Sequence, residues 1–194
     1  MDITCAILAG GKSSRMGRDK ATLKICNKPL IQQVYEKAQH VFRKILIVSS
    51  YHDQLPGIEV PIVKDIFPFR SSIVGIASAL LSANTAYVFI LACDMPFVTA
   101  QSIEHVLKEV HGEDIIIPRT RYGFEALHAV YSRSCLSIML TRIALQRLKV
   151  RDLLPFFSVR EVGEHPVFIN KEISVFTNIN VEEDLSLVQR LGNK

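Results

Sequence analysis

The chain begins with a short apolar run that stops abruptly in a glycine-rich, basic stretch. Residues 3–8 (ITCAIL) have the length and composition of a buried β-strand, and residues 9–20 read AGGKSSRMGRDK. Adjacent glycines let the backbone turn tightly and expose its N–H groups. Those donors and four nearby cations favour a polyphosphate site. The cations are Lys12, Arg15, Arg18 and Lys20. A surface turn with scattered charges is the simpler interpretation, but these cations would repel one another without an anion.

Residue spacing excludes two common phosphate-binding loops. A P-loop has the form G-x-x-x-x-G-K-[ST], and its first glycine would fall on Ala6, inside the expected strand. A dinucleotide fingerprint has the form G-x-G-x-x-G and an acidic residue at the end of the second strand. The glycines here stand at 10, 11 and 17, and the second expected strand runs into Val48-Ser49-Ser50. The loop therefore belongs to another class of phosphate site.

Apolar runs alternate with helical patterns through the first two thirds of the chain. The runs predict strands at 3–8, 44–49, 60–63, 87–92 and 114–117. Apolar spacing of three to four residues predicts helices at 30–42, 72–83 and 102–110, the last capped by Thr99. Continuous apolar strands separated by amphipathic helices are typical of a parallel sheet covered on both faces.

The alternation weakens after Pro118 but does not break. We expect a strand at 127–131, a helix at 134–147, short strands at 159–162 and 174–176, and a final helix at 182–191. The sequence contains no internal repeat, linker or low-complexity tract. We therefore expect one domain over 1–194, an α/β Rossmann-like three-layer α/β/α sandwich with a mostly parallel sheet.

Composition narrows the range of partners. The chain has 194 residues, 48% of them hydrophobic and 22% charged, with a net charge of +4, which suits an anionic small molecule. The basic residues cluster in one loop, so we expect no nucleic-acid partner. The four cysteines form no C-x-x-C pair, which predicts reduced thiols and a cytoplasmic location. No apolar stretch approaches the roughly 18 residues of a membrane span, and no signal peptide is expected.

An aspartate follows the fourth expected strand directly. In open α/β sheets, ligands bind beyond the carboxyl ends of the strands. The strand at 87–92 runs into residues 93–97 (CDMPF), so Asp94 should lie beside the glycine-rich loop. A carboxylate there suits Mg²⁺, which prefers oxygen ligands and is usually held by one or two protein groups with water and phosphate. The alternative is that Asp94 caps the next helix, for which Thr99 is better placed.

The stretch LAGGKSSRMGRDK, at 8–20, resembles the nucleotidyltransferases, and most closely the molybdenum cofactor guanylyltransferase (MobA) family. The resemblance implies that the loop wraps a nucleoside triphosphate. In this family Lys20 would neutralise charge developing on the phosphates, and Arg15 would contact the same phosphates. The nucleotide would also meet the start of the loop, at Leu8, Ala9, Gly10 and Gly11. The fold implied is that of nucleotidyltransferases, which is similar to glycosyltransferase A.

Other segments extend the resemblance over nearly the whole chain. CDMPF resembles the metal-binding aspartate motif of the family, which implies that Asp94 binds both the metal and the nucleotide. Asp65 matches an aspartate of the nucleotide site. The segment 176–185 (FTNINVEEDL) resembles a C-terminal motif whose second asparagine, here Asn180, approaches the metal, although Asn180 could equally cap the last helix. His128, in a segment that the resemblance places on the pterin side, reads as a buried strand histidine rather than a catalyst.

Two departures leave the preferred base open. Ser71-Ser72 replaces a Gly-Pro of the family, and residues 48–50 lack the asparagine that the family often carries near the guanine or ribose. The Gly10-Gly11 pair resembles the guanylyl branch, whereas sister enzymes more often have L-A-A-G. A molybdopterin cytidylyltransferase or another small NTP-transferase therefore stays an alternative.

The resemblance implies that the chain transfers GMP from GTP to the terminal phosphate of molybdopterin, with or without molybdenum. The products would be molybdopterin guanine dinucleotide and pyrophosphate, and Mg²⁺ would be required. Molybdenum-insertion proteins and apo-molybdoenzymes would be further partners, and no membrane would be involved. A molybdopterin carrier without activity is the alternative from another class, but a carrier has no need for both Lys20 and Asp94.

Overall fold

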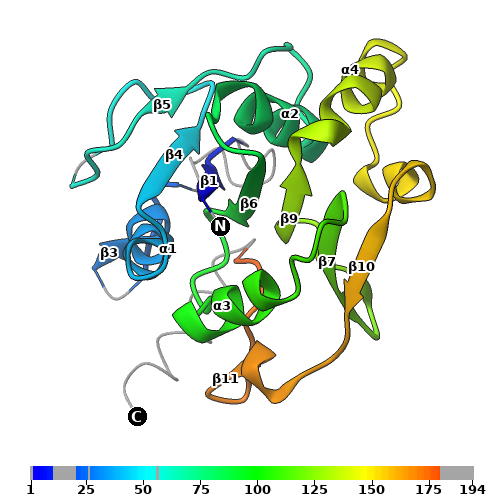
Figure 1. Ribbon diagram of the computed structural model, residues 1–194. Coiled ribbons are helices and arrows are strands. Elements are labelled where there is room, and N and C mark those ends of the chain that lie inside the picture. The colour runs from blue at the N-terminus through cyan, green and yellow to red at the C-terminus, as the bar shows by residue number, and fades with distance from the viewer. Residues whose placement is uncertain (1, 11–20, 26, 56, 180–194) are drawn as a thin grey trace.

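A computed structural model describes residues 2–10, 21–25, 27–55 and 57–179. Its main sheet has the strand order β10-β7-β9-β6-β1-β4-β5 (Figure 1). The strands are β1 (Ile3–Leu8), β4 (Lys44–Val48), β5 (Ile62–Val63), β6 (Tyr87–Ala92), β7 (Ile115–Thr120), β9 (His128–Ser132) and β10 (Val159–Val162). Short strands form a hairpin of β2 (Lys24–Ile25) with β3 (Lys28–Pro29), a hairpin of β11 (Ile169–Asn170) with β12 (Ile173–Ser174), and a β8 (Gly123–Phe124) paired with β7.

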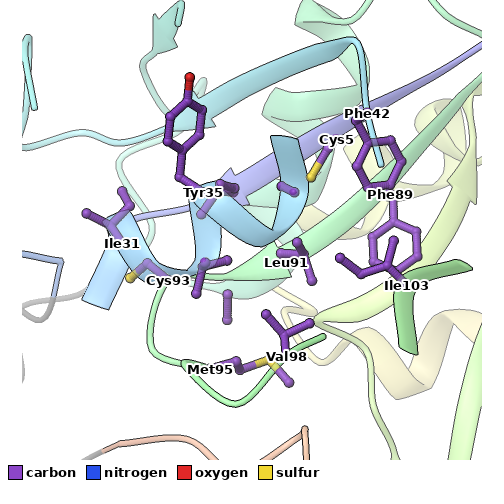
Figure 2. Packing of buried hydrophobic residues seen from close by; sticks show 14 of the residues in the cluster. Cys5, Ile31, Tyr35, Phe42, Phe89, Leu91, Cys93, Met95, Val98 and Ile103 are labelled. Atoms are coloured by element: carbon purple, nitrogen blue, oxygen red, sulfur yellow. The ribbon is translucent and has the colours of Figure 1, made fainter. Parts of the chain in front are cut away.

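Helices cover both faces of the sheet (Figure 1). They are α1 (Leu30–Gln39), α2 (Ser72–Ser82), α3 (Ala100–Lys108) and α4 (Leu136–Ala144). Successive side chains of a strand point to opposite faces, and β1 shows this clearly. Ile7 joins a core with α1 and α3, part of which appears in Figure 2, whereas Ala6 joins a core with α2 and α4. This arrangement confirms the expected three-layer α/β/α sandwich.

The direction of β9 is the main feature of the sheet that alternation did not predict. Neighbouring pairs β1–β4, β1–β6, β4–β5 and β7–β10 are parallel, but β9 runs antiparallel to both β6 and β7. A parallel connection needs a crossover of about a dozen residues or more. The chain between β7 and β9, residues 121–127, is too short for one and contains β8. The strand expected at 127–131 is therefore present, but reversed.

Local signals explain where the elements begin and end. The strands expected at 3–8 and 87–92 have the same bounds in the structure. Thr99 caps α3 as expected: Thr99 Oγ1 accepts a hydrogen bond from Ser102 N at 3.0 Å, and Ser102 Oγ accepts one from Thr99 N at 3.2 Å. This capping box starts α3 at Ala100, two residues before the expected helix. The expected helix at 182–191 lies outside the described residues.

Within the described ranges, no helix is long and apolar enough to cross a membrane.

His128 is buried in an aromatic cluster. Its side chain is 0% exposed, and its ring centroid lies 5.2 Å from that of Phe89, 5.3 Å from Phe176 and 6.3 Å from Phe168. Among the described residues, neither ring nitrogen makes a hydrogen bond of acceptable geometry. Burial lowers the pKa of His128 to about 4, against a smaller opposing effect of the Ser102 backbone. His128 thus belongs to the core, as its position in a strand indicates.

We expect His128 to make folding stability depend on pH. Its pKa is near 6.5 in an unfolded chain and about 4 in the folded chain, so the folded state disfavours the imidazolium. Its stabilising contribution is complete above about pH 6.5 and falls as the pH drops toward 4. Between pH 7.5 and 5 the loss should be about 2 kcal/mol. Urea unfolding of the wild type and His128→Leu at both pH values measures it. Equal pH dependence in both proteins would contradict this assignment.

Candidate functional site

The strands β1, β4, β5 and β6 are parallel neighbours, so their carboxyl ends lie at one edge of the sheet. Backbone hydrogen bonds continue the pairing one residue beyond the strands. They join Ala9 N to Val48 O (2.8 Å), Cys93 N to Leu8 O (3.1 Å) and Ser49 N to Val63 O (2.9 Å). The first residues of the loops after β1, β4 and β6 are therefore held in fixed positions beside one another. This edge is where an open α/β sheet binds its ligand.

Gly10 and Asp65 lie side by side at this edge. A Cβ atom placed on Gly10 would be 3.7 Å from Asp65 Oδ2, which is an ordinary van der Waals contact. The residue that opens the glycine-rich stretch is thus adjacent to the aspartate that follows β5. Gly11, Arg15 and Lys20 lie outside the described residues.

One serine hydroxyl donates to the Asp65 carboxylate, and a second lies beside it. Ser50 Oγ donates a hydrogen bond to Asp65 Oδ2 at 2.9 Å, and Ser78 Oγ lies 3.5 Å from Asp65 Oδ1. Ser78 comes from α2 and is fully buried. Its Oγ accepts a hydrogen bond from Ile66 N at 3.0 Å and donates one to Val74 O at 2.8 Å. Ser78 therefore fixes the backbone that follows Asp65, a role that its place in an apolar helix pattern does not reveal.

Ser49 organises the loop after β4. Its side chain is 0% exposed, and its Oγ lies 3.2 Å from Ala9 O and 2.9 Å from His52 Nδ1. The same oxygen accepts hydrogen bonds from the backbone N–H groups of Tyr51 and His52, each at 3.3 Å. One buried hydroxyl thus ties this loop to the residue before Gly10.

Helix α2 approaches the end of β1 closely. A Cβ atom on Gly75 would lie 3.0 Å from Leu8 Cδ1, tighter than ordinary side-chain contacts. Glycine at this position lets the first turns of the helix pack directly on Leu8. The helix in turn carries Ser78, so the end of β1 and the support of Asp65 belong to one packed unit.

Asp94 lies in the turn after β6, partly buried. Its carbonyl oxygen accepts a hydrogen bond from Ile179 N at 2.9 Å. Ile179 is 3% exposed and packs with Ile25 and Leu30, which anchors the C-terminal segment at this point. Asn178 therefore precedes a residue bonded to the Asp94 loop. Asn180 lies outside the described residues.

The carboxylate of Asp94, just after the end of β6, is the kind of ligand that suits Mg²⁺. The described part of the chain holds no group of three or more His, Cys, Asp or Glu side chains that could bind a metal. Zn²⁺ sites in proteins need three or four such ligands. Mg²⁺ is commonly bound through one or two carboxylates, with waters and substrate phosphates completing its octahedron. Asp94, one residue after the Cys93 N–H that bonds Leu8 O, fits that second pattern.

The hairpin of β7 and β8 lies on the far side of β9. Because β7 is parallel to β6, its carboxyl end lies at the same edge of the sheet. Two arginines there stack on aromatic rings: the Arg119 guanidinium lies 5.3 Å from the Phe124 centroid, and that of Arg121 lies 4.8 Å from the Tyr122 centroid. Arg119 also pairs with Glu161 at 2.8 Å. Tyr122 is 83% exposed, so this flank offers aromatic and cationic surface.

A family model described as "MobA-like NTP transferase domain" matches residues 5–161. The chain is 32% identical over 186 residues to the molybdenum cofactor guanylyltransferase of Desulfosudis oleivorans, covering 94% of this chain and 92% of that one. The crystal structure of molybdopterin-guanine dinucleotide biosynthesis protein A from Archaeoglobus fulgidus superposes with a TM-score of 0.84, at 29% identity and 98% coverage of both chains. The 2-C-methyl-D-erythritol 4-phosphate cytidylyltransferase of Thermus thermophilus shares the fold, with a TM-score of 0.72, 14% identity and complete coverage of both chains.

We expect Ser78→Ala to destabilise the folded state. The change leaves Ile66 N–H without its acceptor and removes the hydroxyl beside Asp65. The loss should be about 1–2 kcal/mol of unfolding free energy. Ser82→Ala is the matched control, because Ser82 is an exposed serine at the end of the same helix. Urea unfolding at pH 7.5 compares the two variants. Equal unfolding free energies would show that the Ser78 hydroxyl does not stabilise the folded state.

Proposed function

Because the chain belongs to the MobA-like NTP transferase family, we propose that it transfers GMP from GTP to the terminal phosphate of molybdopterin, releasing pyrophosphate. The product would be molybdopterin guanine dinucleotide. Family membership confirms the nucleotidyltransferase class expected from the glycine-rich motif. The observation that carries the choice of substrates is the near-complete match to relatives named for this activity and this product.

Such a transfer needs no nucleophilic side chain, because the attacking phosphate is already anionic. Catalysis then consists of positioning and charge stabilisation. In this proposal the backbone from Leu8 to Gly11 binds the triphosphate. Arg15 and Lys20 neutralise charge on the phosphates as pyrophosphate leaves. Asp65 contacts the nucleotide, and the hydrogen bond from the Ser50 hydroxyl, which keeps the carboxylate in place, supports this role.

Asp94 would hold Mg²⁺, with Asn180 as a second ligand. The support is the position of Asp94 in the turn after β6, at the ends of the strands. When bound, Mg²⁺ supplies positive charge to the phosphates of the nucleotide. The hydrogen bond from Ile179 N to the Asp94 carbonyl supports the proposal that Asp94 and Asn180 bind the same ion, because it joins the Asp94 turn to the segment that continues into Asn180.

We also propose where the chain acts, how many domains it has and which proteins it meets. The chain would act in the cytoplasm as one domain over 1–194, and would exchange molybdopterin with molybdenum-insertion proteins and apo-molybdoenzymes. Support for a reducing compartment comes from Cys5, Cys93 and Cys135, which are buried and form no disulfide within the described ranges. Burial also raises the pKa of the Cys5 and Cys135 thiols, which keeps them unreactive.

Pyrophosphate release tests the proposal directly. The purified protein is supplied with Mg²⁺, molybdopterin and GTP, CTP, ATP or UTP in separate reactions. We expect release with GTP and none with the other nucleotides, and chelation of Mg²⁺ should stop the reaction. Preference for CTP would move the protein to the cytidylyl branch. Nucleotide binding without release of pyrophosphate would favour the carrier.

Removing Asp94 or Lys20 should abolish most turnover without unfolding the protein. We expect Asp94→Asn and Lys20→Ala each to lower kcat by about 10²-fold or more, because each removes charge that acts on the transferring phosphate. Asp53→Asn is a matched control for Asp94→Asn, since Asp53 is an exposed carboxylate paired with Lys64. A kcat near the wild-type value in either test variant would refute the role given to that residue.

A further inference from the structure

Tyr51 and Arg70 form a pair to which the proposed chemistry gives no role. The Arg70 guanidinium lies 5.4 Å from the centroid of the Tyr51 ring, a cation–π geometry. The two residues come from different loops, one after β4 and one after β5. Tyr51 directly follows Ser50, which hydrogen-bonds Asp65, the neighbour of Gly10. The pair therefore lies at the ligand-binding edge of the sheet, on the side of β4 and β5.

The Tyr51 side of this pair is held in place. Ser49 Oγ accepts the Tyr51 N–H at 3.3 Å and lies 3.2 Å from Ala9 O, so the Tyr51 backbone is tied to the end of β1. On the other side, Ser71 Oγ donates to Leu148 O at 2.9 Å, which fixes the residue after Arg70. Both backbones are anchored while the side chains face solvent: Tyr51 is 40% exposed and Arg70 is exposed.

Within the described ranges, no carboxylate engages the Arg70 guanidinium. Lys64, Arg119 and Arg160 each have a carboxylate oxygen within 3 Å, whereas the described residues give Arg70 none within 4 Å. Stacking on an aromatic ring uses the face of the guanidinium and leaves its N–H groups pointing outward in the plane. The pair thus places a guanidinium over an aromatic ring, next to the predicted nucleotide site.

We propose that Arg70, held on the Tyr51 ring, reads the base of the nucleotide by donating two hydrogen bonds to O6 and N7 of guanine. This inference rests on the proposed function, since it requires a nucleotide bound at Gly10 and Asp65. Guanine presents two adjacent acceptors that match the arginine fork. Adenine places an amino donor where guanine has O6. Cytosine does have an adjacent acceptor pair, N3 and O2, but O2 lies next to the glycosidic bond, so this pair does not occupy the position that O6 and N7 take in guanine. Arg70 would therefore favour GTP over ATP and CTP.

An arginine at this edge has one clear rival role, which is binding a phosphate or the ribose. Such a contact would be common to all nucleotides and would not depend on N7 or O6. Nucleotide analogues separate the two roles. 7-Deaza-GTP lacks the N7 acceptor, whereas ITP keeps O6 and N7 and lacks only the 2-amino group.

The experiment measures equilibrium binding of GTP, ITP, 7-deaza-GTP, ATP and CTP, each with Mg²⁺, to the full-length protein. We expect the wild type to bind GTP and ITP similarly and 7-deaza-GTP more weakly. Arg70→Gln should weaken the binding of GTP and of ITP by about tenfold or more, the effect expected for the loss of a bidentate base contact. The same variant should bind CTP as the wild type does and should no longer distinguish GTP from 7-deaza-GTP.

Two further variants sharpen the result. Arg70→Lys keeps the charge but loses the fork, so it should also lose the discrimination between GTP and 7-deaza-GTP. Arg160→Gln is the matched control, because it removes an arginine of β10, at the other end of the strand order and already paired with Glu109, and it should leave all five affinities unchanged.

Equal weakening of every nucleotide in Arg70→Gln would overturn the inference in favour of a phosphate or ribose contact. Unchanged affinities in that variant would also overturn it, as would a wild type that binds CTP more tightly than GTP. The pyrophosphate assay reports separately on the proposed function. If the wild type releases pyrophosphate with GTP and Arg70→Gln keeps its preference for GTP, the proposed transferase activity stands and Arg70 has no role in base selection.

Discussion

The site depends on the way β1 is held between its two neighbours. β1 pairs in parallel with both β4 and β6, and hydrogen bonds from Ala9 and Cys93 carry this pairing just past the strands. The loops leaving these strands must therefore start side by side, facing the same way. Because of this constraint, the loop that contains Gly10 and the turn that contains Asp94 leave the sheet from adjacent positions, although many residues separate them in the sequence. The buried side chains on both faces of β1 keep the strand from moving relative to the helices.

The features that sequence patterns predicted well are those with a local cause. Continuous apolar runs give the bounds of β1 and β6, and Thr99 caps α3 because its hydroxyl meets an N–H three residues on. The reversed direction of β9 was not predicted, since a run of apolar residues has no direction. Ser49 and Ser78 were not identified as supports of the site, because their importance comes from contacts with residues distant in sequence, Ala9 and Asp65. The family resemblance identified Asp65 as a site residue. Its proximity to Gly10 depends on the pairing of β5 with β4, which the sequence does not reveal.

The choice of base is a property of loops rather than of the fold. A cytidylyltransferase at 14% identity superposes over the full length of the chain. The sheet and helices are therefore compatible with enzymes acting on different nucleotides, and selection has to come from side chains beyond the strand ends. In this chain the loop after β4 is organised by one buried hydroxyl, that of Ser49, and the loop after β5 by another, that of Ser78. Substitutions in these loops can alter recognition while the scaffold stays unchanged.

The reversed strand β9 also sets the distance between β1 and β7. Its insertion places β7 three strand spacings from β1, which is about 14 Å at the usual distance between neighbouring strands. Because β7 ends at the same edge as β1, any molecule that contacts both Gly10, directly after β1, and the end of β7 has to span about that length. A compact acceptor, such as inorganic phosphate, could reach one end of this span and not the other. The sheet order thereby sets a minimum length for an acceptor that uses both ends of the edge.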